Sequence, residues 1–129
     1  MFTLEQIKSA HSKVKSGADF PAYIKELKDF GVIQYESFVM DGHTDFYGTN
    51  AFKMTTPVKY PELKVAETSN ELQFKADLKA HQAGKTDFLR FCNDAANSGI
   101  EKWAVTMKDM RCSYFDKAGQ IILVEEIPQ

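Results

Sequence analysis

The sequence predicts an α+β fold in which one helix–helix–strand–strand–strand unit is used twice. Two stretches beginning at Asp19 and Asp87 lie 68 residues apart and align without a gap. Over 19–54 and 87–122 only four of 36 positions are identical, but residue classes agree at helix and turn positions. Agreement at a fixed spacing is typical of a repeated unit. We therefore expect tandem duplication and two antiparallel meanders covered by helices, although unrelated helix–hairpin units would share part of this pattern.

The first two helices follow from apolar spacing and end signals. Residues 3–16 carry apolar side chains every three or four positions, with Thr3 able to cap the start and Gly17 able to end the helix. Asp19 is expected to cap a second helix, which ends at Gly31.

The third and fourth helices have similar signals in the second half. The run Thr68-Ser69-Asn70-Glu71 is a candidate capping box that opens a helix over about 69–83, which Gly84 ends. The fourth helix follows Asp87 and stops at Gly99. Its apolar stripe places Cys92 inside the core, and Cys112 is expected on the inward side of a strand.

Six strands are predicted from alternating apolar and polar residues between turn signals. A two-residue turn at Asp41-Gly42 joins the first two strands. Asp109-Met110 is expected to do the same in the second half. The expected strands are 34–39, 45–47, about 51–56, 103–107, 111–115 and 120–127.

The length of 129 residues fits a single domain. We expect a first pseudo-repeat over about 3–56, a connector over 57–67 and a second pseudo-repeat over about 68–127. A half of about 60 residues buries only a small core. The two halves should therefore share one interior.

Composition excludes several classes of function. The net charge is −2 with no basic stripe, which argues against binding driven by nucleic-acid phosphates. No apolar run approaches 18 residues, and Met1–Gln6 lacks the features of a secretory signal, so we expect no membrane span and a cytoplasmic location. Phosphate-loop, dinucleotide and paired-cysteine zinc motifs are absent from the sequence. We expect neither a cofactor nor a metal site.

Two histidine–aspartate pairs are the only candidates for acid–base catalysis. His81 could act with Asp87, and His43 could act with Asp45. Each has a plainer interpretation, because His81 lies at an apolar helix position and His43 lies in a turn. Two-residue turn geometry would place Asp45 opposite Phe38, so the side chains need not converge.

One face of the strands carries candidate binding residues. With two-residue turns, the side chains that point away from the helices include Phe38, Tyr47, Phe115, Ile122 and Val124. The run 121–124 is apolar on both sides, which a half-exposed strand should not be. We expect this face to be covered by the other half of the chain, by a second copy, or by a ligand or protein partner, in that order.

A long string of motifs resembles a known family. It comprises 81–88, Phe91-Cys92, 99–103, 112–116 and 125–128. The string is similar to a bacterial and prophage-associated domain family of unknown function, often labelled "phage envelope protein". The resemblance implies no established activity, substrate or site residue. An envelope protein would show a membrane segment or a secretion signal, and this sequence shows neither.

The sequence therefore predicts a small, soluble, non-catalytic binding or interaction protein that self-associates as a homodimer. The alternative is an enzyme of unknown type that uses one of the histidine–aspartate pairs. A third hypothesis, a prophage accessory factor that acts on a protein partner, rests on the resemblance alone.

Overall fold

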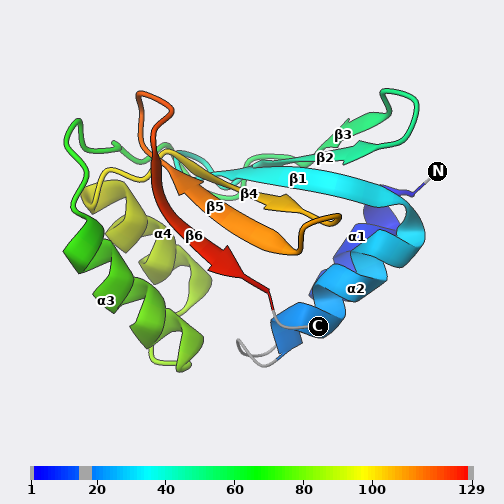
Figure 1. Ribbon diagram of the computed structural model, residues 1–129, viewed down its shortest axis with the longest axis horizontal. Helices are drawn as coiled ribbons and strands as arrows, with labels where there is room; N and C mark the ends of the chain where they lie inside the picture. The colour runs from blue at the N-terminus through cyan, green and yellow to red at the C-terminus, as the bar shows by residue number, and fades with distance from the viewer. Residues whose placement is uncertain (1, 15–18, 128–129) are drawn as a thin grey trace.

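A six-stranded antiparallel sheet with all of the described helices on one side forms the body of the protein (Figure 1). The computed structural model describes residues 2–14 and 19–127. The strand order is β3-β2-β1-β4-β5-β6. The α+β class and the helix–helix–strand–strand–strand order, used twice, are confirmed; descent from a duplicated ancestor stays a prediction.

The helices of the first half begin and end close to the predicted signals. Helix α1 spans Leu4–His11, and Thr3 caps it through a reciprocal pair of hydrogen bonds with Gln6. Helix α2 spans Phe20–Phe30, and the predicted side-chain cap at its start is wrong, because the Asp19 side chain makes no capping hydrogen bond. The helix ends at Gly31, whose φ of 102° only glycine adopts at little cost. Gly17, expected to end the first helix, lies outside the described residues, as does Pro128.

Capping side chains also fix where the two helices of the second half begin. Helix α3 spans Glu71–Gln82 and starts slightly later than predicted, because the Asn70 side chain, not that of Thr68, accepts from the backbone N–H of Gln73 at 3.1 Å. Helix α4 spans Phe88–Asn97. It follows Asp87, as predicted, and the Asp87 side chain caps it by accepting from the backbone N–H of Arg90 at 2.8 Å.

The strands occupy the predicted segments with small changes at their ends. Two edges bound the sheet: β3 is short, with three residues, and β6 has six. In chain order the strands are β1 (Val32–Phe38), β2 (Thr44–Gly48), β3 (Lys53–Thr55), β4 (Lys102–Thr106), β5 (Arg111–Phe115) and β6 (Ile121–Glu126).

The two-residue turn predicted at Asp41-Gly42 is wrong, because residues 39–43 join β1 to β2. Asp45 pairs with Glu36 instead of Phe38. The register therefore differs from the prediction by two residues. Strand side chains alternate with a period of two, so this shift leaves each side chain on its predicted face.

The connector explains the wider loop between β1 and β2. The backbone N–H of Lys59 donates to the carbonyl of Asp41 at 2.8 Å, and the Tyr60 hydroxyl donates to the carbonyl of Val39 at 2.6 Å. Val39 is itself fully buried. A tight turn at Asp41-Gly42 would continue Val39 as a strand residue and would not present these carbonyls to the connector.

The two halves join edge to edge through β1 and β4. Glu36 pairs with Ala104, and these residues are 68 positions apart (104 − 36 = 68), the spacing of the repeat. An approximate two-fold axis relating the halves therefore passes between them. The expectation that the halves stack face to face is wrong, because this pairing places both meanders in one sheet with one face away from the helices (Figure 1).

A single core lies between the sheet and the helices. Phe74 of α3 is fully buried, with its ring centroid 4.9 Å from Tyr114 of β5 and 6.0 Å from Phe91 of α4. Both halves contribute to this cluster, whose fully buried members include Ile24, Leu27, Val32, Val39, Ile100 and Val105. The expected shared interior is therefore present.

Both thiols are buried in this core, as predicted. Cys92 of α4 is fully buried and Cys112 of β5 is 4% exposed. Burial raises the pKa of Cys92 to about 11 and that of Cys112 to about 12. The two-residue turn predicted at Asp109-Met110 would pair Cys112 with Met107, but Cys112 pairs with Val105, which again shifts the register by two and preserves the face.

We expect Gly99→Ala to lower the free energy of unfolding by about 3 kcal/mol or more, because both strain and a clash arise. Gly99 has a φ of +78°, and a Cβ there would lie 2.7 Å from the Cα of Ser69 and from the carbonyl oxygen of Thr68. Urea denaturation measures the loss.

The matched control is Gly31→Ala, at the equivalent helix end of the first half. Gly31 has a φ of +102°, but a Cβ at this position would have nothing within 4 Å of it. We therefore expect a loss of about 1 kcal/mol from strain alone. Equal losses in the two variants would contradict this account.

Candidate functional site

The face of the sheet away from the helices carries most of the predicted site residues. We call it the open face (Figure 1). Because strand side chains alternate between faces, its members are the strand residues that alternate with the core-facing ones. They include Glu36, Phe38, Asp45, Tyr47, Lys53, Lys102, Ala104, Phe115 and Val124.

Lys102 lies at the centre of the open face. Its Nζ is 2.6 Å from a carboxylate oxygen of Glu36, on the neighbouring strand. The same Nζ lies 5.8 Å from the ring centroid of Phe38 and 5.4 Å from that of Phe115. These are cation–π distances, and the lysine side chain is 28% exposed. The lysine is therefore fixed between two rings and a carboxylate.

A second group of contacts extends from Glu36 toward β3. The Tyr47 hydroxyl donates to Glu36 at 3.3 Å, and the Nζ of Lys53 lies 5.7 Å from the Tyr47 ring centroid. Asp45 accepts from the Thr55 hydroxyl at 2.7 Å and lies 3.8 Å from the Nζ of Lys53. Burial and the nearby carboxylates of Glu36 and Asp45 raise the pKa of Tyr47, so its hydroxyl stays protonated.

His43 pairs with Asp41 instead of Asp45. Both its backbone N–H and its ring Nδ1 lie within hydrogen-bond distance of Oδ1 of Asp41, and its ring stacks on Phe38 with centroids 4.4 Å apart. Burial alone would raise the pKa of Asp41, but the hydrogen bonds and the charge of His43 outweigh it and lower that pKa. This pair supports the loop at one end of the open face.

The other predicted pair, His81 and Asp87, is also engaged elsewhere. Nδ1 of His81 lies 3.0 Å from the carbonyl oxygen of Thr86, and its ring stacks on Phe91 with centroids 4.5 Å apart. The Asp87 carboxylate caps α4 by accepting a hydrogen bond from the backbone N–H of Arg90. A catalytic role for either histidine stays a prediction, and neither pair has the contact that this prediction assumed.

Four of the five predicted binding residues lie on the open face, and one does not. β6 carries a bulge, because Phe115 pairs with Ile121 whereas Tyr114 pairs with Leu123. Ile122 is skipped by this pairing and packs, partly buried, against the core. Its predicted outward position is therefore wrong. The residues that remain on the face are Phe38, Tyr47, Phe115 and Val124.

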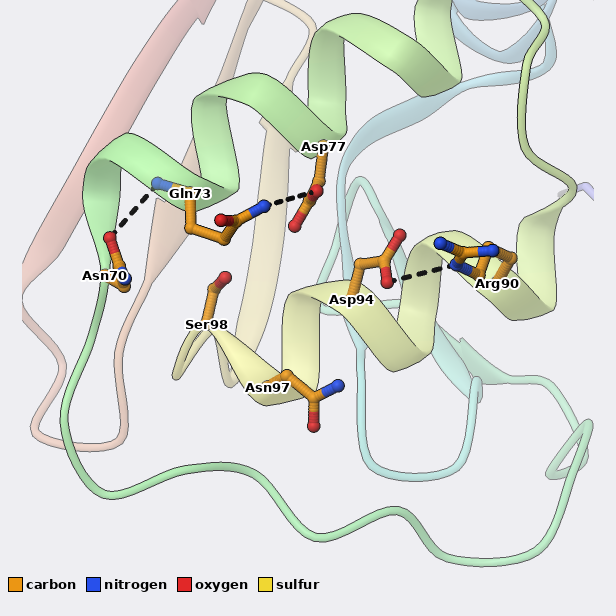
Figure 2. Close-up of a pocket in the computed structure, with 7 residues that line it drawn as sticks. All are labelled: Asn70, Gln73, Asp77, Arg90, Asp94, Asn97 and Ser98. Carbon is orange, nitrogen blue, oxygen red and sulfur yellow. Dashed lines mark hydrogen bonds and ion pairs between the residues drawn. The ribbon is translucent and has the colours of Figure 1, made fainter.

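A second feature, which we call the α3–α4 groove, lies between the two helices of the second half. Its volume is about 310 Å³. Figure 2 shows the residues that line it, all of which have polar side chains: Asn70, Gln73, Asp77, Arg90, Asp94, Asn97 and Ser98. Sequence reasoning missed these residues. The signal was present, since 70, 73 and 77 follow one helical stripe and 90, 94 and 97 follow another.

Residues 2–14 and 19–127 contain neither a metal-binding cluster nor a membrane-spanning helix. Within these ranges, no three histidine, cysteine or acidic side chains come together in a way that could hold a metal ion. None of the helices in the described part of the chain has both the length and the apolarity needed to cross a membrane.

Comparison with known proteins gives a family and a relative. The sequence profile of a family described as "Protein of unknown function (DUF1398)" matches residues 8–126. The "Uncharacterized protein YcgX" of Escherichia coli (strain K12) is 26% identical over 65 residues, which is 50% of this chain and 48% of the relative. The match therefore spans about half the length of that relative.

We expect Asp41→Asn to lower the free energy of unfolding at pH 7 by about 1–2 kcal/mol, because a charged acceptor of two His43 hydrogen bonds is lost. The folded pKa of Asp41 is lowered, so its stabilising contribution is complete above the unfolded pKa of about 3.9. It is lost as the pH falls through the folded pKa, and the two proteins should then converge. Urea denaturation across this pH range measures the difference.

Asp109→Asn is the matched control, because Asp109 occupies the equivalent turn of the second half (41 + 68 = 109) and is exposed. It should leave stability unchanged. A wild-type-like Asp41→Asn variant at neutral pH would contradict the proposed role of this pair.

Proposed function

Because the chain belongs to the DUF1398 family of proteins of unknown function, we propose a role for it from the geometry of its open face. The protein is a non-catalytic interaction protein, the open face is its contact surface, and a second copy of the chain is its partner. The observation that carries this proposal is a full sheet face, with aromatic side chains, that the helices leave uncovered (Figure 1).

The charges on the open face are paired with one another. Among the described strands, each cation on the face lies within 4 Å of a carboxylate, so the face is close to neutral. A second copy could cover these side chains without leaving one charge unpartnered, which is the costly outcome when ionic groups are desolvated. The pairs are Lys102–Glu36, Lys53–Asp45 and Arg111–Glu126.

The size of the face suits a small dimer interface. Strands lie about 4.8 Å apart and rise about 3.4 Å per residue, so this sheet presents on the order of 500 Å² per copy. Two such faces give about 1,000 Å², near the lower bound for a specific interface. A two-fold pair of identical faces is also the commonest arrangement of soluble oligomers.

Aromatic anchors and apolar edge residues support the same assignment. Phe38 and Phe115 flank Lys102, and Tyr47 extends the aromatic surface toward β3. Aromatic side chains dominate the binding energy of many interfaces. On the edge strand, Ile121 is 57% exposed and Val124 is 45% exposed. Exposed apolar residues beside partly buried aromatic ones are typical of a contact surface.

The other hypotheses have less support. The comparisons give nothing in favour of the enzyme alternative. The side chains that it requires, His43 and His81, have partners other than the proposed aspartates. An association with phage, a different protein partner and a cytoplasmic location stay predictions.

Light scattering on purified protein tests the proposal. We expect a dimer at tens of micromolar, and Val124→Lys should weaken dimerisation at least about tenfold, because a charge would be placed in an apolar contact. The matched control is Leu72→Lys, which makes the same kind of change on α3, at a residue that is 81% exposed on the helix side. It should leave the dimer intact.

A wild-type protein that stays monomeric up to about 1 mM would remove self-association from the proposal. Equal weakening by the two lysine variants would show that net charge, and not the open face, controls assembly.

A further inference from the structure

The polar side chains of the α3–α4 groove bond within their own helices and not across it. Gln73 donates through Nε2 to Oδ1 of Asp77 at 2.9 Å on α3, and Nε of Arg90 donates to Oδ1 of Asp94 at 3.2 Å on α4. Among the described residues, no side-chain hydrogen bond joins the two walls. The groove therefore presents polar groups from both sides to whatever fills it.

Ser98 offers the groove a hydroxyl group that is available to bind an occupant. The residue is 1% exposed, and Figure 2 shows its hydroxyl pointing from the end of α4 toward α3. Within the described part of the chain, this hydroxyl makes no hydrogen bond to another side chain, and the residue lines the groove. Every fully enclosed side-chain polar atom of the described residues has a partner, so this hydroxyl is not sealed off, and water or a bound group can reach it through the groove.

The charge of the groove indicates what kind of partner fits. Asp77 and Asp94 project into it from opposite helices (Figure 2). Arg90 pairs with Asp94, but its side chain is 67% exposed, so it lies toward solvent. The lining has two carboxylates against one guanidinium, a net charge of −1. Among the described contacts, the partner of the Asp77 carboxylate is a neutral amide.

We propose that the α3–α4 groove binds a small organic compound through a primary ammonium group. An ammonium carries a positive charge and three donors and no acceptor. The carboxylate of Asp77 and the hydroxyl of Ser98 accept two of those donors, and the amide oxygen of Asn97 lies on the same wall as Ser98. The volume of about 310 Å³ is at the lower end for small-molecule sites, which suits a short amine.

This site is separate from the proposed dimer surface. The groove is formed by helices on one side of the sheet, and the open face is the other side (Figure 1). Failure of one proposal therefore leaves the other intact.

Calorimetric titration with putrescine, a short alkyl diamine, tests the proposal, with butanediol as the uncharged compound of the same length. We expect saturable binding of putrescine at low ionic strength and none of butanediol. Asp77→Asn should weaken the affinity at least about tenfold, because the carboxylate that faces the ammonium is removed. Asp109→Asn makes the same charge change at a distant exposed turn and should leave the affinity unchanged.

Ser98→Ala gives a second, independent readout. If the hydroxyl serves the ligand, the variant should bind putrescine several-fold more weakly, yet the free protein should be as stable as the wild type or more stable. The proposal is overturned if putrescine fails to bind up to about 10 mM, if butanediol binds equally well, or if Asp109→Asn weakens binding as much as Asp77→Asn. A marked loss of stability in Ser98→Ala would also overturn it, because the hydroxyl would then have a structural partner.

Discussion

The backbone pairing of β1 with β4 is the constraint on which the rest of this structure depends. It runs from Gln34 opposite Thr106 to Phe38 opposite Lys102. A three-stranded meander with two helices buries only a small core by itself. Once β1 and β4 pair, the two helix pairs cover one continuous sheet, and buried residues of both halves form one core cluster. The same pairing makes the opposite face continuous across both halves.

Local signals predicted most of the helices, strands and helix ends, whereas tertiary contacts set the width of the loop between β1 and β2. Thr3, Asp87 and Gly31 were identified from sequence because capping is decided within a few residues. The loop over 39–43 was not predicted, because its width depends on a connector about 20 residues further along the chain. Because the predicted register was wrong by two residues, each strand residue still lies on its predicted face of the sheet. Ile122 was the exception, since the bulge opposite Phe115 is not visible in an alternating pattern.

For the candidate site, the sequence predicted only which strand residues share a face, because that follows from the alternation of side chains along a strand. Alternation places Phe38, Tyr47 and Phe115 on one face without any knowledge of strand order. The ion pair between Glu36 and Lys102 joins residues that are 66 positions apart, and it exists only because β1 and β4 are neighbours. The partner of His43 was misassigned for a related reason: the true loop brings Asp41 back to its ring, whereas a tight turn would not. The polar stripes of α3 and α4 could be identified as one groove only from the structure, which places the two helices side by side.

The two ends of the sheet are unequal. β3 offers only three residues, with Lys53 at its start, whereas β6 offers six residues with exposed Ile121 and Val124. Short, charged edges resist the addition of further strands, and long apolar ones invite it. A sheet with one protected end can be extended in one direction only. A strand-to-strand contact between two copies through β6 would pair their two long edges and leave only the short β3 edges, which are poor templates for further strands.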